Sequence, residues 1–360
     1  MNYLQNCFEK NRLVIIEFMN KYYNRKNHIK NLLENVYYTN LILLRNCVEM
    51  ACDEYFQKQK APKIDLYLIA REVSSPIARG SDSLPLSIHF GKKDTYLMDS
   101  AQFGMEPLVQ KEFSLVYCYL PSFRAETPDD RHLNQFYHCE AELRGNYIDA
   151  INVAEKLVQY IFKRVLILHQ KKVFKFSQHN FPLLPIIAKT KFPQITFDEA
   201  HKILTQNKLG HLIKNQSYGR SITNQGEKKI VEIVTGNKLP LWITKYDRDT
   251  VPFYQLPDPK NKNRTLNADL LFPSLNGGFG GEIVGSGQRQ KNVKEIFISM
   301  KRQDLKGANN YKWYIDLRRR RDYKATAGFG LGIERLITWM LQLSSIHDAC
   351  VYPVIKADFE

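Results

Sequence analysis

Near its C-terminal end the chain reads Gly328-Phe329-Gly330-Leu331-Gly332-Ile333-Glu334-Arg335-Leu336. The glycine-rich part predicts a strand, and the apolar spacing that follows predicts a helix from about Glu334 to Leu343. The strand would therefore run directly into the helix, whose first turn carries Arg335. An arginine at the start of a helix can address a phosphate group, so this stretch indicates a place for an anionic ligand.

A second informative region is a predicted hairpin. Residues 115–119 and 135–139 have strand-forming composition and flank a polar, proline-containing segment at 126–130. Since side chains alternate along a strand, His138, Glu140 and Glu142 share one face of the return strand. With arginines on either side of the turn, these charges can converge on a charged ligand. The alternative is a solvated hairpin with cross-strand ion pairs.

The third region is the segment Gly281-Glu282-Ile283-Val284-Gly285-Ser286-Gly287-Gln288-Arg289. A lone acid sits there in an apolar, glycine-rich strand, seven residues before an arginine. The glycines permit a ligand to approach the backbone closely, and a carboxylate at this place can hold Mg²⁺. A β-bulge with a tolerated edge charge is the alternative interpretation.

The order of elements predicts an α+β fold. Helical spacing marks residues 31–56 and 148–170, partial alternation marks a strand over 63–73, and residues 311–317 form a further apolar segment. Antiparallel strand pairs mixed with flanking helices favour α+β over a doubly wound parallel sheet. We interpret residues 171–265, where polar and proline-containing stretches interrupt short apolar pieces, as an elaboration on the core.

Composition limits the functional class. The 360 residues include 52 Lys plus Arg against 37 Asp plus Glu, a formal charge of +15 that attracts polyanions such as nucleotides, RNA or anionic membrane, unless it serves only solubility. Six scattered cysteines indicate neither a disulfide framework nor a structural zinc site. Because no apolar run approaches ~20 residues and no secretory signal opens the chain, we expect a cytoplasmic protein that does not enter membranes.

Taken together, these segments resemble the catalytic core of class II aminoacyl-tRNA synthetases, and within that class the asparaginyl branch. The sequence FRAE at 123–126, followed by RHL at 131–133, is similar to motif 2 of the class, and GFGLGIERL at 328–336 is similar to motif 3. The resemblance implies an antiparallel sheet of about six strands flanked by helices. It also implies a catalytic domain over residues 36–360 after an N-terminal helical extension at 1–35, and a homodimer formed through residues 31–73.

The resemblance implies roles for individual residues. Arg124 and Arg335 would be catalytic, on the α- and γ-phosphates of ATP, and Glu282 would hold Mg²⁺ with Asp269 as a second ligand. The implied ATP-binding residues are Arg124, Glu126, Arg131, His132, Phe136, Glu282 and Arg335. The implied amino-acid-binding residues are Ser100, Gln102, Met105, Glu140 and Arg289.

The implied function is that of an ATP-dependent ligase that activates an amino acid as its adenylate. Aspartate-specific members carry a lysine where this chain has Met105, so a neutral amide, asparagine or a close analogue, is the favoured substrate. Only ~35 residues precede the core, where asparaginyl-tRNA synthetases carry an anticodon-reading OB-fold. We therefore expect the acyl acceptor to be a small molecule, or a tRNA that is not read through its anticodon.

Two other functions stay open at this point. One is ammonia-dependent asparagine synthesis from aspartate, and the other is a non-catalytic regulatory protein that binds nucleotide or RNA. The basic run at 318–321 bears on RNA binding: Arg319, Arg320 and Arg321 form either a polyanion-binding surface or a solvated strand end.

Overall fold

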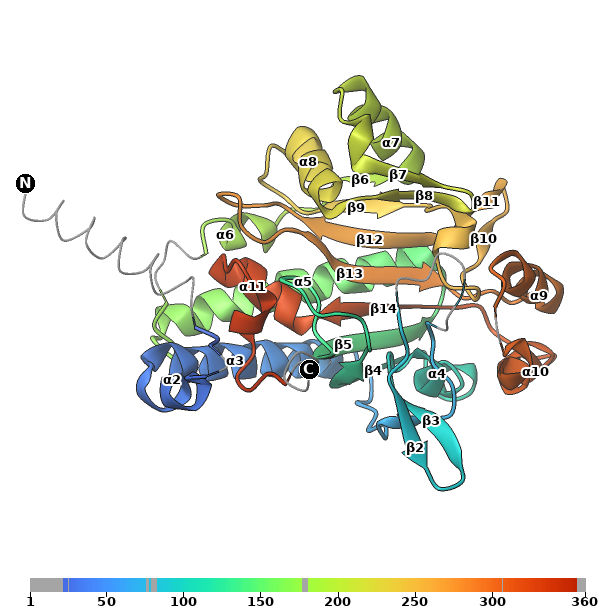
Figure 1. The fold of residues 1–360 in the computed structure, drawn as a ribbon, viewed down its shortest axis with the longest axis horizontal. Coiled ribbons are helices and arrows are strands. Elements are labelled where there is room, and N and C mark those ends of the chain that lie inside the picture. The colour runs from blue at the N-terminus through green and yellow to red at the C-terminus, as the bar shows by residue number, and fades with distance from the viewer. Residues whose placement is uncertain are drawn as a thin grey trace, which may run out of the picture.

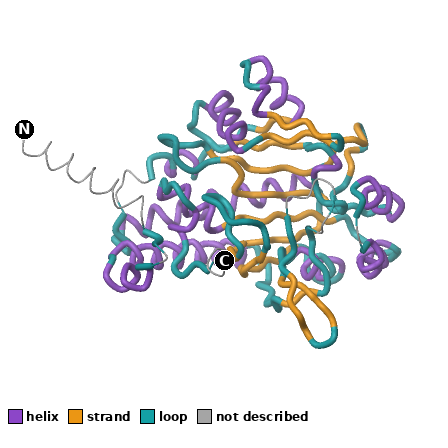
Figure 2. The backbone as a smooth tube through the Cα atoms, in the orientation of Figure 1, coloured by secondary structure: helices purple, strands orange, loops and turns teal. Residues whose placement is uncertain are grey.

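The computed structural model describes residues 22–24, 26–75, 78, 83–176, 181–305 and 307–354. Within these residues the centre is a seven-stranded sheet in the order β4-β5-β14-β13-β12-β9-β6, which Figures 1 and 2 show edge to edge across the molecule. Its strands are β4 (Leu115–Phe123), β5 (Gln135–Arg144), β6 (Gln194–Thr196), β9 (Leu241–Thr244), β12 (Asn267–Phe272), β13 (Gly281–Gln288) and β14 (Thr326–Gly332).

The pairing of these strands confirms the predicted fold class. All neighbours are antiparallel except β6 and β9, which pair in parallel at one edge. The sheet thus has one strand more than the six expected, and both β6 and β9 come from the region interpreted as an elaboration. The predicted hairpin is β4–β5, in which Cys118 pairs with Glu140 and Leu120 with His138.

Two long helices build the main core against this sheet. The helix α5 (Tyr147–Gln170) begins at Asn146, which accepts from the backbone N–H of Asp149 while the Asp149 carboxylate accepts from that of Asn146. Its buried stripe recurs every three or four residues and packs on β13, β14 and α3 (Val36–Lys58). Figure 1 shows α5 crossing behind the sheet with α3 beside it. No helix of the described part is long and apolar enough to cross a membrane.

Smaller elements surround the sheet. A second apolar cluster lies where α7 (Phe197–Gln206) and α8 (Asn224–Thr235) cover the β9 edge of the sheet. Another lies around α9 (Val293–Arg302) and α10 (Lys312–Arg318), which Figure 1 shows at one end of the strands. The remaining helices are α2 (His28–Glu34), α4 (Gln102–Met105), α6 (Leu184–Ile187), α7 (Phe197–Gln206), α8 (Asn224–Thr235), α9 (Val293–Arg302), α10 (Lys312–Arg318) and α11 (Ile333–Leu341). The remaining strands are β1 (Ile69–Ala70), β2 (Ser87–Phe90), β3 (Lys93–Leu97), β7 (Ile213–Gln216), β8 (Gly219–Ile222), β10 (Pro257–Asp258) and β11 (Asn261–Thr265).

The structure departs from the sequence-based expectation of a strand over residues 63–73, and it shows that the basic residues 319–321 follow a helix and not a strand. The strand expected over residues 63–73 is reduced to β1, because among the described residues its strand pairing is limited to two positions on β3 and one bridge between Lys63 and Tyr117. Residues 311–317 belong mostly to the helix α10. Of the predicted N-terminal extension, residues 1–21 and residue 25 lie outside the described residues, and the described part contains α2.

The basic run at 318–321 divides between core and surface. The guanidinium of Arg318 is buried and donates to Glu106, whose side chain is fully buried as well, and to the carbonyl oxygen of Gln290. Arg319 is exposed and pairs with Asp316, whereas Arg320 pairs with Asp322. Arg318 therefore ties α10 to the segment after α4 and takes no part in a polyanion-binding surface.

This contrast between adjacent arginines yields a stability prediction. Replacing Arg318 with Leu leaves the buried Glu106 carboxylate without its cationic partner, with the Tyr323 hydroxyl as a remaining donor, which costs about 3–5 kcal/mol. We expect Arg319→Leu to change the free energy of unfolding by less than about 1 kcal/mol, because an exposed ion pair is screened by solvent. Urea denaturation followed by circular dichroism measures both variants, and equal losses would contradict the assignment of Arg318 to the core.

Candidate active site

The residues predicted to bind ATP surround one cavity. Its volume is about 110 Å³, and it lies where the β4–β5 hairpin meets β13 and the start of α11. The predicted residues that line it are Arg124, Glu126, Arg131, His132, Phe136, Glu282 and Arg335. All seven come together because the hairpin, β13 and β14 are neighbours in the sheet and β14 leads directly into α11.

The cations of this cavity are held by aromatic rings and carboxylates. The guanidinium carbon of Arg124 lies 5.2 Å from the ring centroid of Phe136, and its buried Nε has no hydrogen-bond partner. Arg335 donates from Nη1 to the Glu282 carboxylate at 3.0 Å. Arg131 lies over the ring of Phe279 at 4.7 Å. Several guanidiniums thus converge on one space, as binding of a polyphosphate requires.

Glu227 is a site residue that the sequence did not reveal. Its carboxylate accepts from the backbone N–H of Glu282 at 3.2 Å and lies 4.0 Å from Arg131. It comes from the first turn of α8, inside the region interpreted as an elaboration, where no recognisable motif surrounds it. The packing of α8 against β13 brings it to Glu282 and Arg131, which line the cavity, so it supports the cavity from behind them.

The predicted metal ligands fit Mg²⁺. Asp269 and Glu282 both approach Gly285, at 3.7 and 3.2 Å from the position that a Cβ would take there. Burial and the neighbouring carboxylates of Glu282 and Glu227 raise the pKa of Asp269, a cost that a bound cation would relieve. No group of three or more His, Cys, Asp or Glu in the described chain is arranged to hold a metal ion. Two carboxylates suit Mg²⁺, which keeps waters and phosphate oxygens as its other ligands.

A second cavity, of about 290 Å³, continues the first, and we call it the recess. Arg124, His138, Glu282 and Gly330 line both. Of the predicted amino-acid-binding residues, Ser100, Gln102, Glu140 and Arg289 line this second cavity. A ligand that spans the two cavities would place its midpoint beside Arg124 and Glu282.

Glu140 is kept charged at the edge of this second cavity. It accepts from the Ser100 hydroxyl at 2.6 Å, from the Ala101 backbone N–H at 3.2 Å, and is 3.1 Å from His138 Nδ1. Burial by itself raises the pKa of Glu140, but these hydrogen bonds and the charge of His138 outweigh it and lower the pKa. A carboxylate that stays ionised in a recess is a suitable partner for a substrate ammonium group.

Arg289 forms a bidentate pair with Glu142 on the floor of the cavity. Arg289 Nε and Nη2 donate to the two carboxylate oxygens at 3.0 and 2.7 Å, and both side chains are buried. Burial lowers the pKa of Arg289, yet the Glu142 charge more than compensates and the pKa is raised. Gly328 makes room for this pair, since a Cβ there would lie 2.1 Å from Glu142 Oε2 and 2.5 Å from Arg289 Nη2.

Met105 is the predicted substrate residue that the structure does not bring to the cavity. Its side chain is fully buried in an apolar cluster with Val109, Val116 and Cys118, beneath β4. It therefore lies in the core, where a lysine would need a partner for its charge.

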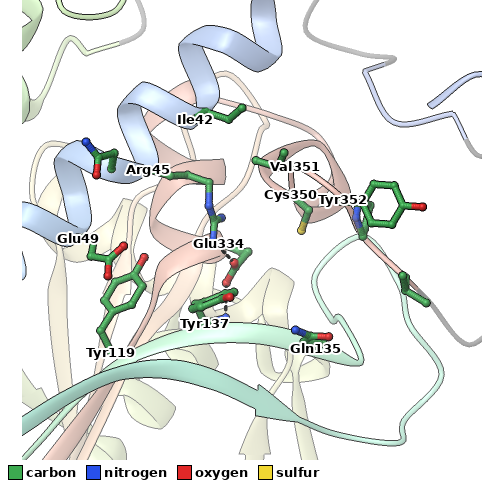
Figure 3. Close-up of a pocket in the computed structure, with 13 residues that line it drawn as sticks. Ile42, Arg45, Glu49, Tyr119, Gln135, Tyr137, Glu334, Cys350, Val351 and Tyr352 are labelled. Carbon is green, nitrogen blue, oxygen red and sulfur yellow. Dashed lines mark hydrogen bonds and ion pairs between the residues drawn. The ribbon is translucent and has the colours of Figure 1, made fainter. Parts of the chain in front are cut away.

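Glu334 links this site to a neighbouring cavity of about 450 Å³. In Figure 3, Arg45 extends from α3 toward Glu334, which also contacts Tyr137. The Glu334 carboxylate accepts from Arg45 Nη2 at 2.7 Å and from the Tyr137 backbone N–H at 2.8 Å. This pair fixes the first turn of α11, and with it the neighbouring Arg335, against the hairpin.

Chemically, the site offers guanidiniums for phosphates, carboxylates for Mg²⁺ and an adjoining recess for a ligand that carries an ammonium group. A carboxylate held in the recess would lie near Arg124 and Glu282, where the α-phosphate of a bound nucleotide is expected. Attack of a carboxylate on that phosphorus needs mainly positioning and neutralisation of charge, which these side chains supply.

Comparisons with known proteins agree with this geometry. The family model described as tRNA synthetases class II (D, K and N) matches residues 20–356. The asparagine–tRNA ligase of Thermoplasma acidophilum is 30% identical over 322 residues, which cover 88% of this chain and 69% of the relative. That of Thermococcus kodakarensis is 32% identical over 264 residues, covering 72% of this chain and 57% of the relative. This chain thus spans between somewhat over half and about two thirds of their length.

A solved structure extends the comparison to the fold. The asparaginyl-tRNA synthetase of Pyrococcus horikoshii, complexed with asparaginyl-adenylate, superposes with a TM-score of 0.78 at 27% identity, covering 92% of this chain and 71% of that protein. The match confirms the resemblance stated from the sequence. The chain therefore belongs to the class II tRNA synthetases (D, K and N), a family of ATP-dependent ligases.

Proposed function

We propose that this protein uses ATP and Mg²⁺ to activate asparagine as asparaginyl-adenylate and passes the acyl group to an acceptor. The observation that carries the proposal is the continuity of the two cavities, which share Arg124 and Glu282 where the reacting groups would meet. The solved relative that superposes on this chain holds asparaginyl-adenylate, which supports the same product here.

In this proposal Arg124 binds the α-phosphate and Arg335 the γ-phosphate, while Phe136 stacks on the adenine. Glu282, with Asp269, holds Mg²⁺, which when bound offsets phosphate charge. The substrate ammonium lies against Glu140 and its carboxylate points toward Arg124. The substrate carboxylate oxygen then attacks the α-phosphorus, the bond from that phosphorus to the β-phosphate oxygen breaks, and pyrophosphate leaves.

The choice of amide over carboxylate is supported by the charges around the recess. Arg289 is already matched by Glu142, and no lysine is among the described residues that line the recess. An aspartate β-carboxylate would thus find no unpaired cation near Arg289, and its burial would be costly. An uncharged amide avoids that cost.

The proposal is tested by ATP–pyrophosphate exchange over the twenty amino acids. We expect asparagine to support exchange at least about 100-fold better than aspartate. Arg124→Ala and Arg335→Ala should each lower the rate about 100- to 1000-fold, since each removes a preorganised contact to phosphate charge. Arg319→Ala, on the exposed end of α10, is the matched control and should retain the wild-type rate. Exchange driven by aspartate alone would indicate asparagine synthesis, and no exchange with any amino acid would overturn the proposal.

For the acceptor, we propose transfer that does not depend on an anticodon. The support is the tip of the β4–β5 hairpin, where the Asn134 amide donates to the carbonyl oxygens of Arg124 and Glu126 and holds the turn beside the first cavity, close to where an acceptor would meet the adenylate. We expect a minihelix carrying only the acceptor stem of an asparagine tRNA to be charged within about tenfold of the full transcript, or neither to be charged at all. Charging of the full transcript about 1000-fold faster than of the minihelix, measured with radiolabelled asparagine, would overturn this part.

We also propose a homodimer formed through residues 31–73. Apolar side chains are exposed along this unit, among them Val36 at 68%, Tyr67 at 91% and Ile69 at 46%. Large apolar side chains exposed on a folded chain are typical of an interface. We expect sedimentation at micromolar concentration to give a dimer that the double variant Tyr67→Glu, Ile69→Glu converts to monomer. The control Phe90→Glu, on the exposed β2 strand, should stay dimeric, and a monomeric wild type would contradict the proposal.

A further inference from the structure

Gln255 is an amide side chain in the recess that neither the sequence motifs nor the charges above explain. It follows Tyr254 in the segment that pairs with the end of β13, and its side chain is 9% exposed. The side chain lines the recess, and its carbonyl oxygen Oε1 has no hydrogen-bond partner. A buried polar atom without a partner is costly, on the order of 1–3 kcal/mol, and so indicates a ligand that satisfies it.

The backbone places this amide next to the Arg289–Glu142 pair. Gln255 and Arg289 are opposite each other in an antiparallel bridge, so their side chains leave the same face of the sheet. The Gln255 amide lies directly on Gly287, where a Cβ would be 2.0 Å from Oε1. Gly287 is in turn the register partner of Gly328, the glycine that accommodates the Arg289–Glu142 pair. Two adjacent glycines thus let an amide and an ion pair lie side by side on the sheet.

The hydrogen-bonding capacity of this floor is complementary to a carboxamide. Arg289 uses Nε and Nη2 for Glu142, so Nη1 is the nitrogen that the pair leaves for a carbonyl oxygen. Gln255 Oε1 accepts only, and a primary amide supplies the N–H that it needs. A carboxylate in the same place has no proton to donate and would face the Gln255 oxygen with its own lone pairs.

We propose that Gln255 is a specificity-determining residue, which accepts a hydrogen bond from the substrate's side-chain amide while Arg289 donates to the amide oxygen. This inference rests on the proposed activation of asparagine and deepens it. It assigns the rejection of substrates without an amide N–H to a side chain outside the three motif segments.

The test compares substrates and variants in pyrophosphate exchange. In Gln255→Leu, which keeps the approximate volume but removes the acceptor, we expect the KM for asparagine to rise about 10- to 100-fold while the KM for ATP stays within about twofold. Gln255→Glu retains an acceptor oxygen and should keep the KM for asparagine within about fivefold. If Gln255 only filled space, Gln255→Leu would keep the KM for asparagine and Gln255→Glu would raise it. The matched control is Gln110→Leu, a buried glutamine bonded to Lys324 away from the recess, which should change neither KM.

A substrate analogue supplies the second arm, which needs no variant to fold. The β-methyl ester of aspartate keeps the carbonyl oxygen of asparagine and replaces its NH₂ by OCH₃. The wild-type protein should prefer asparagine over this ester about 10- to 100-fold in kcat/KM, and Gln255→Leu should abolish most of that preference.

The outcomes separate this inference from the proposed function. Asparagine exchange with an unchanged KM in Gln255→Leu, or equal use of the ester by the wild type, overturns the role of Gln255 and leaves the proposed function standing. If the wild type gives no exchange with asparagine, the proposed function fails. In that case, calorimetric titration with asparagine and with the ester tests the role of Gln255. Equal affinities for the two compounds, or no binding of either, would overturn that role.

Discussion

The structure depends on the pairing of charges that the sheet and its helices bury. Each of four buried or partly buried glutamates is matched by an arginine from a distant part of the chain: Glu106 by Arg318, Glu142 by Arg289, Glu282 by Arg335 and Glu334 by Arg45. Removing water from a carboxylate without supplying a partner costs several kcal/mol, so each pair forms only when the surrounding elements are in place. These pairs therefore specify how the hairpin, β13, α10 and α11 come together.

The same pairs prepare the site for its ligands. Arg335 and Glu282 hold each other at the position where we propose that phosphate and Mg²⁺ bind, and Arg45 holds Glu334 so that the first turn of α11 is fixed. Because these partners are oriented by the fold before a ligand arrives, little reorganisation is needed when it binds. Among the three arginines that line the first cavity, Arg124 is the least committed to an internal contact, since its Nε has no partner in the described structure, whereas Arg131 and Arg335 each donate to another residue.

The local sequence was sufficient to predict an element wherever that element carried its own pattern of residues. The hairpin followed from two strand-forming runs around a polar tip, and the length of α5 followed from an apolar repeat that begins after Asn146. It was insufficient where pairing with a remote segment decides the outcome. The alternation over residues 63–73 predicted a long strand, yet strand pairing there is limited, in the described structure, to two positions on β3 and one bridge. Met105 shows the same limit, since its place in the substrate segment did not reveal that it faces the core.

The sequence by itself determined the α+β class, the family and the seven predicted residues that surround the first cavity, because those residues stand in three short motifs whose spacing is local. Tertiary structure alone decided which further side chains join them. Glu227 reaches Glu282 through the packing of α8, and the Gln255 amide reaches the recess because Gly287 leaves space for it. Both follow from contacts between segments far apart in the chain, and no local pattern of residues encodes such a contact.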